Sequence, residues 1–150
     1  MGKLTSVAQW RAEDRAELFT ETAARTGITS PIAIEKDYWV CWALDLVFQS
    51  AYRDVLVFKG GTSLSKVYRL VDRFSEDIDI VVDRAMLGFG GEASPEKAPS
   101  KKQRGKRLDA LKDKCREWVQ GPLASALTER ITATLGGEGW KLEVDPAADD

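Results

Sequence analysis

Two aspartates one residue apart, Asp77 and Asp79, stand in an apolar run and are the residues of this chain best suited to chemistry. On a strand, residues i and i+2 project from the same face, so the two carboxylates would lie side by side. Adjacent carboxylates repel each other unless a cation or protons intervene, and Mg²⁺ or Mn²⁺ prefers such hard oxygen ligands. The pair therefore predicts a metal site with both aspartates as catalytic ligands. A strand face that merely carries charge is the alternative interpretation.

A glycine turn precedes this pair. The apolar run Val55–Phe58 predicts a strand, and a helix is expected from Thr62 to Leu70. Glycine lets the backbone approach a phosphate closely, and the first N–H groups of a helix are free to bind it. The residues expected to hold phosphate are Gly60, Gly61, Thr62 and Ser63. Two glycines alone also fit a tight turn without a ligand, and the Walker and dinucleotide glycine patterns are absent.

The composition narrows the chemistry further. The chain contains no histidine, which excludes Ser-His and Cys-His catalysis and histidine metal sites. Its two cysteines, Cys41 and Cys115, are too few for a disulfide framework or a metal-binding cluster. Any reaction must therefore use carboxylates, lysine, hydroxyl groups and bound metal. Because no signal segment or membrane-length apolar run is present, a cytoplasmic protein without membrane association is expected.

Charge is spread unevenly along the chain. The 150 residues, 43% hydrophobic and 31% charged, have the composition of one globular domain, and the net charge of -2 gives no global sign of nucleic-acid binding. Between Lys97 and Arg116, however, nine Lys and Arg residues accompany only Asp109 and Asp113. Such a block fits a phosphate-binding surface, and a solvated helix face is the plainer interpretation.

The elements that position these residues follow from hydrophobic periodicity and from glycine and proline. The N-terminal part, 1–50, is expected to be helical, with one helix from Ser6 to Arg25 ended by Gly27 and a central core helix from Pro31 to Ser50. Inner, catalytic strands are expected within 54–83, followed by a mobile loop over 84–100. A basic helix is expected over 101–119, ended by Gly121-Pro122. A helix and a strand are expected over 123–145, and the strand is Trp140–Asp145.

Three segments carry a family resemblance: residues 34–39 (Ile-Glu-Lys-Asp-Tyr-Trp), 58–66 (Phe-Lys-Gly-Gly-Thr-Ser-Leu-Ser-Lys) and 73–79 (Arg-Phe-Ser-Glu-Asp-Ile-Asp). Together they resemble the AbiEii/AbiGii nucleotidyltransferase toxins, which act in toxin–antitoxin and phage abortive-infection systems and so in antiviral defence. The resemblance covers nearly the whole chain. It implies an α/β (α+β) fold with a DNA polymerase β-like nucleotidyltransferase core, in which helices flank a small mixed sheet.

The resemblance also implies an activity. The enzyme would transfer a nucleoside monophosphate from an NTP to an RNA acceptor, with tRNA 3′ ends as the expected target, using Mg²⁺ (or Mn²⁺) at Asp77 and Asp79. A cognate antitoxin protein is the implied partner. The implied nucleotide-binding residues are Gly60, Gly61, Thr62, Ser63, Lys66, Arg73 and Ser75, and the implied contacts to RNA or phosphate are Lys101, Lys102, Arg104, Lys106 and Arg107. Lys59 matches the motif as well, without a clear role.

The fold implied by this resemblance normally uses a third carboxylate from a later strand. Glu143 and Asp145 share the polar face of the last predicted strand and are the two candidates, unless that group lies beyond residue 150. Members of the family are longer, so the chain is expected to be an N-terminal core that lacks a C-terminal half. The alternative function is then a truncated, non-catalytic module that binds nucleotide or a partner. A glycosyltransferase is a weaker alternative, because it leaves the glycine turn unexplained.

Overall fold

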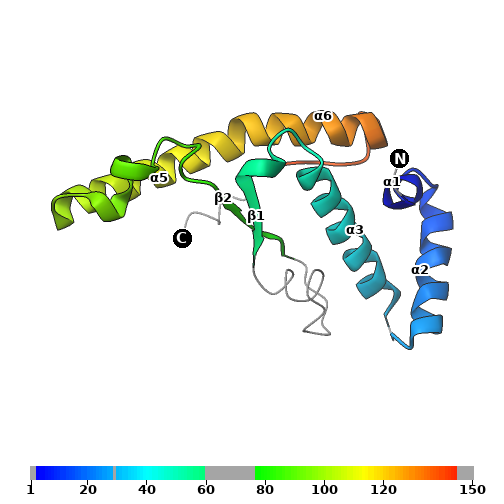
Figure 1. Cartoon of the computed structure of the whole chain (residues 1–150). Helices are drawn as coiled ribbons and strands as arrows, with labels where there is room; N and C mark the ends of the chain where they lie inside the picture. Colours follow the sequence, from blue (N-terminus) through cyan, green and yellow to red (C-terminus); the bar gives the residue numbers. More distant parts are fainter. Residues whose placement is uncertain (1–2, 29, 60–76, 145–150) are drawn as a thin grey trace.

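The computed structural model describes residues 3–28, 30–59 and 77–144. Its helices pack against one face of a small two-stranded sheet (Figure 1). The helices are α1 (Lys3–Ala8), α2 (Ala12–Thr26), α3 (Pro31–Phe48), α5 (Lys101–Trp118) and α6 (Ala124–Leu135), and the strands are β1 (Leu56–Lys59) and β2 (Asp79–Val82). Short 3-10 turns η1 (Arg53–Val55), η2 (Gly91–Ala93) and η3 (Pro95–Lys97) and the π-helical turn η4 (Val119–Leu123) join them.

The single N-terminal helix predicted from Ser6 to Arg25 is wrong, because the chain forms two helices that meet at residues 9–11. No glycine or proline marks this break in the sequence. Instead, the guanidinium of Arg15 donates hydrogen bonds to the carbonyl oxygens of Ala8 and Trp10, which the end of α1 leaves without helical partners. Gly27 ends α2 in the left-handed conformation (φ 73°), as its position in the sequence indicates.

Helix α3 is the central helix, as predicted, because it belongs to both hydrophobic clusters of the described chain. Val47 joins the cluster behind the sheet, and Trp42 and Leu46 join the cluster beneath α1. The first cluster contains Val47, Leu56, Trp118 and Leu123, and the second contains Ala8, Trp42 and Leu46. Leu127 of α6 packs against both, so α3 and α6 together connect the sheet to the N-terminal helices.

The two strands pair antiparallel, with Leu56 opposite Val82 and Lys59 opposite Asp79. One face of this sheet packs on the core through Leu56, Phe58, Ile80 and Val82, and the ring of Phe58 lies 6.4 Å from that of Phe48. On the other face, Val57 is 61% exposed and Val81 is 44% exposed. The apolar run 55–58 predicts an inner strand, but within the described residues β1 has a single neighbour and one open face.

The segment 84–100, for which a mobile loop is expected, forms turns that several side chains hold in place. Arg107 of α5 donates hydrogen bonds of 2.8 Å to the carbonyl oxygens of both Glu92 and Ser94. The side chain of Pro95, which follows Ser94, is fully buried. Arg84 and Glu96 form an ion pair of 2.6 Å. The mobility of this segment stays a prediction, but its local structure is more regular than its glycine and proline content indicates.

Two predictions about the last third of the chain are wrong. Gly121-Pro122 does not break the helix, because the π-helical turn η4 connects α5 to α6 and the two form one long rod in Figure 1. Pro122 has no N–H to donate, and the wider turn accommodates it without ending the helix. The predicted strand Trp140–Asp145 has an irregular conformation over residues 140–144, where it pairs with no described strand, and Asp145 lies outside the described residues.

The two faces of β1 predict different effects of truncation at neighbouring positions. Leu56→Ala removes a side chain that is 5% exposed and should lower the free energy of unfolding by about 2–5 kcal/mol. Val57→Ala on the open face should lower it by about 1 kcal/mol or less. Urea unfolding followed by circular dichroism measures both values. Equal losses for the two variants would show that both faces of the strand are buried.

Candidate functional site

The carboxylate pair lies on the open face of the sheet, at the end where β1 stops and β2 begins. We call this end of the strand pair the carboxylate edge. Asp79 begins β2 and Asp77 stands two residues before it, and both are exposed. Ile78 and Ile80 alternate with them and are half-buried. This alternation places the two aspartates on the same side of the chain, which is the geometry expected from their spacing. The interpretation that both sit on a buried strand is wrong, since this face is open.

Lys59, which the sequence left without a clear role, is the cross-strand neighbour of Asp79. Directly opposite residues of an antiparallel pair project from the same face, with Cβ atoms about 4.5–5.5 Å apart. The register therefore sets an exposed lysine beside the aspartate pair. A cation in this position can attract the phosphates of a nucleotide, while the carboxylates attract a metal ion. The lysine itself is part of the sequence motif, but its position beside Asp79 follows only from the register of β1 and β2.

The two aspartates fit a magnesium ion that is shared with a substrate. Mg²⁺ in phosphoryl-transfer sites is held by one or two carboxylates, with substrate phosphates and water as its other ligands. Asp77 and Asp79 supply two exposed carboxylates, so both are reachable from solvent. Across residues 3–28, 30–59 and 77–144, no group of three or more Cys, Asp or Glu residues could hold a metal by itself. A metal here would accordingly depend on oxygen atoms from the nucleotide.

The predicted third carboxylate gains no support from the described residues. Glu143 is exposed and forms an ion pair of 2.6 Å with Lys141. Glu143 lies on the irregular segment found where a strand was predicted. No sheet pairing therefore sets the direction of its side chain. Asp145, the other candidate, lies outside the described residues.

The predicted nucleotide-binding residues also lie outside the part of the chain that the structure describes: Gly60, Gly61, Thr62, Ser63, Lys66, Arg73 and Ser75. The described residues on either side of this segment are Lys59 and Asp77. Because Lys59 pairs with Asp79, both junctions stand at the same edge of the sheet. The segment that contains the glycine turn is thus connected at both ends to the edge that carries the carboxylates.

The basic helix α5 is separated from this edge. Four of its predicted contacts, Lys101, Lys102, Arg104 and Lys106, have exposed side chains, whereas Arg107 is half-buried. The guanidinium of Arg107 binds the carbonyls of Glu92 and Ser94, so it already has a structural role. Figure 1 shows the N-terminal end of α5 projecting away from the sheet. The described structure does not bring these basic residues next to Asp79.

Cys41, Tyr38 and Glu96 are among the described side chains whose pKa values are shifted by identifiable causes. Burial raises the pKa of the Cys41 thiol. Burial also raises the pKa of Tyr38, which the charge of Arg15 opposes to a smaller extent. Hydrogen bonding from Arg84 lowers the pKa of Glu96. Both cysteines are free thiols, and a raised pKa keeps Cys41 protonated at neutral pH, so it is a poor nucleophile.

The contacts of Arg107 predict an effect on stability. Arg107→Ala removes two hydrogen bonds that hold residues 92–94 and should lower the free energy of unfolding by about 1–3 kcal/mol. Lys106→Ala, one residue earlier and exposed, should change it by no more than about 0.5 kcal/mol. Thermal unfolding of the two variants beside the wild type gives the comparison. An unchanged melting temperature for Arg107→Ala would mean that these bonds contribute nothing.

The described fold is of the mixed α/β class that was expected, with an antiparallel strand pair that carries the carboxylates at its edge. The family model described as "Nucleotidyl transferase AbiEii toxin, Type IV TA system" matches residues 42–149, which is more than two thirds of the chain. The chain therefore belongs to the AbiEii nucleotidyltransferase toxin family of toxin–antitoxin systems, as its motifs indicate. Helices α1 and α2 and the first half of α3 precede the matched range.

The other two comparisons gave no match, either among curated proteins or among solved structures. Among the described helices, none has the length and apolar character needed to cross a membrane.

Proposed function

We propose that this protein transfers a nucleoside monophosphate from an NTP to an RNA acceptor, the 3′ end of a tRNA, with Mg²⁺ (or Mn²⁺) bound at Asp77 and Asp79. One observation carries the proposal: two exposed carboxylates stand on the open face of the sheet beside Lys59, in a chain that belongs to a nucleotidyltransferase family. Modification of tRNA ends would block translation, and a cognate antitoxin protein would restrain the toxin.

The chain's own residues bind and orient the substrates in this proposal. Asp77 and Asp79 would hold the metal on the open face of the sheet. When bound, the ion neutralises phosphate charge and favours deprotonation of the attacking hydroxyl. Lys59 draws the triphosphate toward the same edge, where the glycine turn Gly60-Gly61-Thr62 would supply backbone N–H groups. The acceptor oxygen forms a bond to the α-phosphorus, the bond from that phosphorus to pyrophosphate breaks, and the acceptor's proton leaves to a carboxylate or to solvent.

The carboxylate pair is tested by isosteric substitution. Asp77→Asn and Asp79→Asn keep the shape of each side chain but remove its charge, so transfer should fall by about a hundredfold or more. Asp83→Asn is the matched control, because Asp83 is an exposed aspartate just after the same strand. Its side chain accepts a hydrogen bond from the backbone N–H of Ala85, which an asparagine can also accept. Incorporation of label from each NTP into total tRNA, with Mg²⁺ and again with EDTA, measures the effect.

The same assay decides between the proposal and its alternative. No transfer from any NTP by well-folded protein would contradict the enzymatic function. If nucleotide or a partner protein still bound, and Asp79→Asn bound equally well, the chain would be a non-catalytic binding module of this fold.

The predicted RNA contacts of the basic helix need a test of their own. Substitution of Lys101, Lys102 and Arg104 should reduce the salt dependence of tRNA binding if these residues contact phosphate.

Lys59 should act on nucleotide affinity rather than on the metal. Lys59→Ala removes the cation beside Asp79 and should raise the KM for NTP roughly tenfold, the effect of one charge-assisted contact worth ~1.4 kcal/mol. Lys59→Arg keeps the charge and should retain most of the affinity. Steady-state kinetics over a range of NTP concentrations separates the two. A fall in kcat with unchanged KM in Lys59→Ala would show that the lysine does not bind the ground-state nucleotide.

A further inference from the structure

A pocket of about 570 Å³ lies among α1, α3, α6 and the segment that follows α6. Figure 1 shows α1 and α2 on one side of α3 and the sheet on the other, so this pocket is built on a different part of the molecule from the carboxylate pair. Four of the five tryptophans of the chain line it: Trp10, Trp39, Trp42 and Trp140. We call it the tryptophan pocket, and its volume is in the range of sites that bind small molecules.

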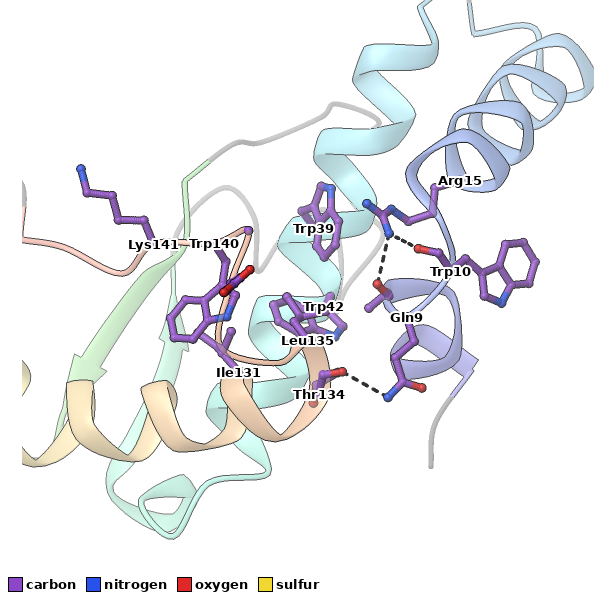
Figure 2. Close-up of a pocket in the computed structure, with 13 residues that line it drawn as sticks. Gln9, Trp10, Arg15, Trp39, Trp42, Ile131, Thr134, Leu135, Trp140 and Lys141 are labelled. Carbon is purple, nitrogen blue, oxygen red and sulfur yellow. Dashed lines mark hydrogen bonds between the residues drawn. The ribbon is translucent and has the colours of Figure 1, made fainter.

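Contacts between distant parts of the chain fix the walls of the tryptophan pocket. Gln9, at the end of α1, donates a hydrogen bond of 3.2 Å to the carbonyl oxygen of Thr134 in α6 (Figure 2). The indole N–H of Trp140 donates to the carbonyl of Gly136 at 2.7 Å, which folds the segment after α6 back on itself. Trp39 and Trp42 meet edge to face, with ring centroids 5.4 Å apart. The rings of Trp39, Trp42 and Trp140 are therefore held by hydrogen bonds and packing, whereas Trp10 is 42% exposed and its ring points away from the other three (Figure 2).

One polar group in this pocket is unsatisfied. The side-chain nitrogen of Trp42 is buried and has no acceptor among the described residues, and Trp42 as a whole is only 6% exposed. A buried N–H without an acceptor is unfavourable, and nearly all such groups in proteins have a partner. An apolar ligand would leave this donor as it is. A ligand that presents a hydrogen-bond acceptor would satisfy it once the Trp42 ring turns toward the pocket, because the nitrogen has almost no accessible surface of its own.

Arg15 is the cation that lies against the aromatic rings of the pocket. Its guanidinium is 5.5 Å from the centroid of the Trp39 ring and donates to the neutral carbonyls of Ala8 and Trp10. Lys141 also lines the pocket, but it forms an ion pair of 2.6 Å with Glu143. Arg15 therefore disfavours an ammonium group beside Trp39, although an aromatic ring alone would attract one, and favours a ligand that carries an anionic group there.

Aromatic rings, an unsatisfied donor and the guanidinium of Arg15 together match one ligand chemistry. A nucleobase is planar, stacks on tryptophan whatever its identity, carries ring acceptors and is attached to phosphate. We propose that the tryptophan pocket binds a nucleobase, at a site separate from Asp77 and Asp79. The base can belong to a free nucleotide or stand unpaired in a single strand. Trp10, Arg15 and Trp39 precede the range matched by the family model, whereas Trp42 and Trp140 lie within it.

Fluorescence titration tests the proposal directly, because the pocket contains most of the chain's tryptophan. The full chain is titrated in EDTA with AMP, with a six-nucleotide oligo(A) and with an abasic ribose-phosphate oligomer of the same length. AMP, the oligonucleotide or both should quench the fluorescence saturably, and the abasic oligomer should bind at least tenfold more weakly. Since stacking on tryptophan contributes on the order of tenfold per base, Trp140→Leu should weaken binding about tenfold.

Two further variants separate the chemical roles. Trp42→Phe keeps a ring but removes the unsatisfied N–H, and it should weaken binding several-fold. Trp118→Phe changes the fifth tryptophan, which packs against Tyr52 in the other hydrophobic cluster, and it should leave binding unchanged. Because EDTA removes divalent metal, binding that persists there is independent of the proposed transfer reaction. If Asp79→Asn loses transfer but still binds the base, this inference stands. If the wild type shows transfer but no base binding, this inference alone is wrong.

Several outcomes would overturn the inference. These are equal binding of the abasic oligomer, wild-type affinity in both Trp140→Leu and Trp42→Phe, or saturable binding only of a peptide rich in aromatic residues. Saturation by AMP as well as oligo(A) identifies a free nucleotide as sufficient, and saturation by oligo(A) alone identifies an unpaired base in a strand. If the variants fail to fold, photolabelling of the wild type with 8-azidoadenosine monophosphate decides: label on peptides containing Trp39 or Trp140 supports the pocket, and label elsewhere contradicts it.

Discussion

The burial of α3 on two sides is the constraint on which the rest of the structure depends. Its Val47 supports the cluster behind the sheet, and Trp42, little more than one turn earlier, lies in the cluster beneath α1. Because one helix belongs to both clusters, the sheet that carries the aspartates and the helices that line the tryptophan pocket are packed against the same element. A helix that is apolar on most faces is stable only when it is covered in this way.

The sheet illustrates how a small core can still present charged residues for function. Leu56, Ile80 and Val82 contribute to the core from one face, and this packing holds the register that sets Lys59 opposite Asp79. The other face is open, so the carboxylates remain hydrated. Burying two neighbouring carboxylates would be strongly unfavourable, whereas an open face lets a metal ion and phosphates reach them. Strand alternation thus separates the residues that stabilise the sheet from those that could act on a substrate.

The sequence predicted those features that depend on local pattern. The central helix, the end of α2 at Gly27 and the shared face of Asp77 and Asp79 all follow from periodicity or from one residue's conformational preference. The features it missed depend on contacts between distant residues. Arg15 stabilises the break after α1, and Arg107 orders residues 92–94 from fifteen and thirteen positions away. The turn at Pro122 was missed for another reason, since a proline usually ends a helix and seldom sits in a π-helical turn.

The tryptophan pocket could not be predicted from the sequence, because it also depends on contacts between distant residues. Its tryptophans stand at positions 10, 39, 42 and 140, and only the packing of α3 against α1 and α6 brings them together. Stacking does not distinguish one base from another, whereas transfer requires a particular oxygen to reach a particular phosphorus. A nucleobase held in this pocket would therefore retain a strand without selecting its sequence. The carboxylate edge lies within the family match, whereas five of the residues that line the pocket precede it, so the two sites differ in position as well as in chemistry.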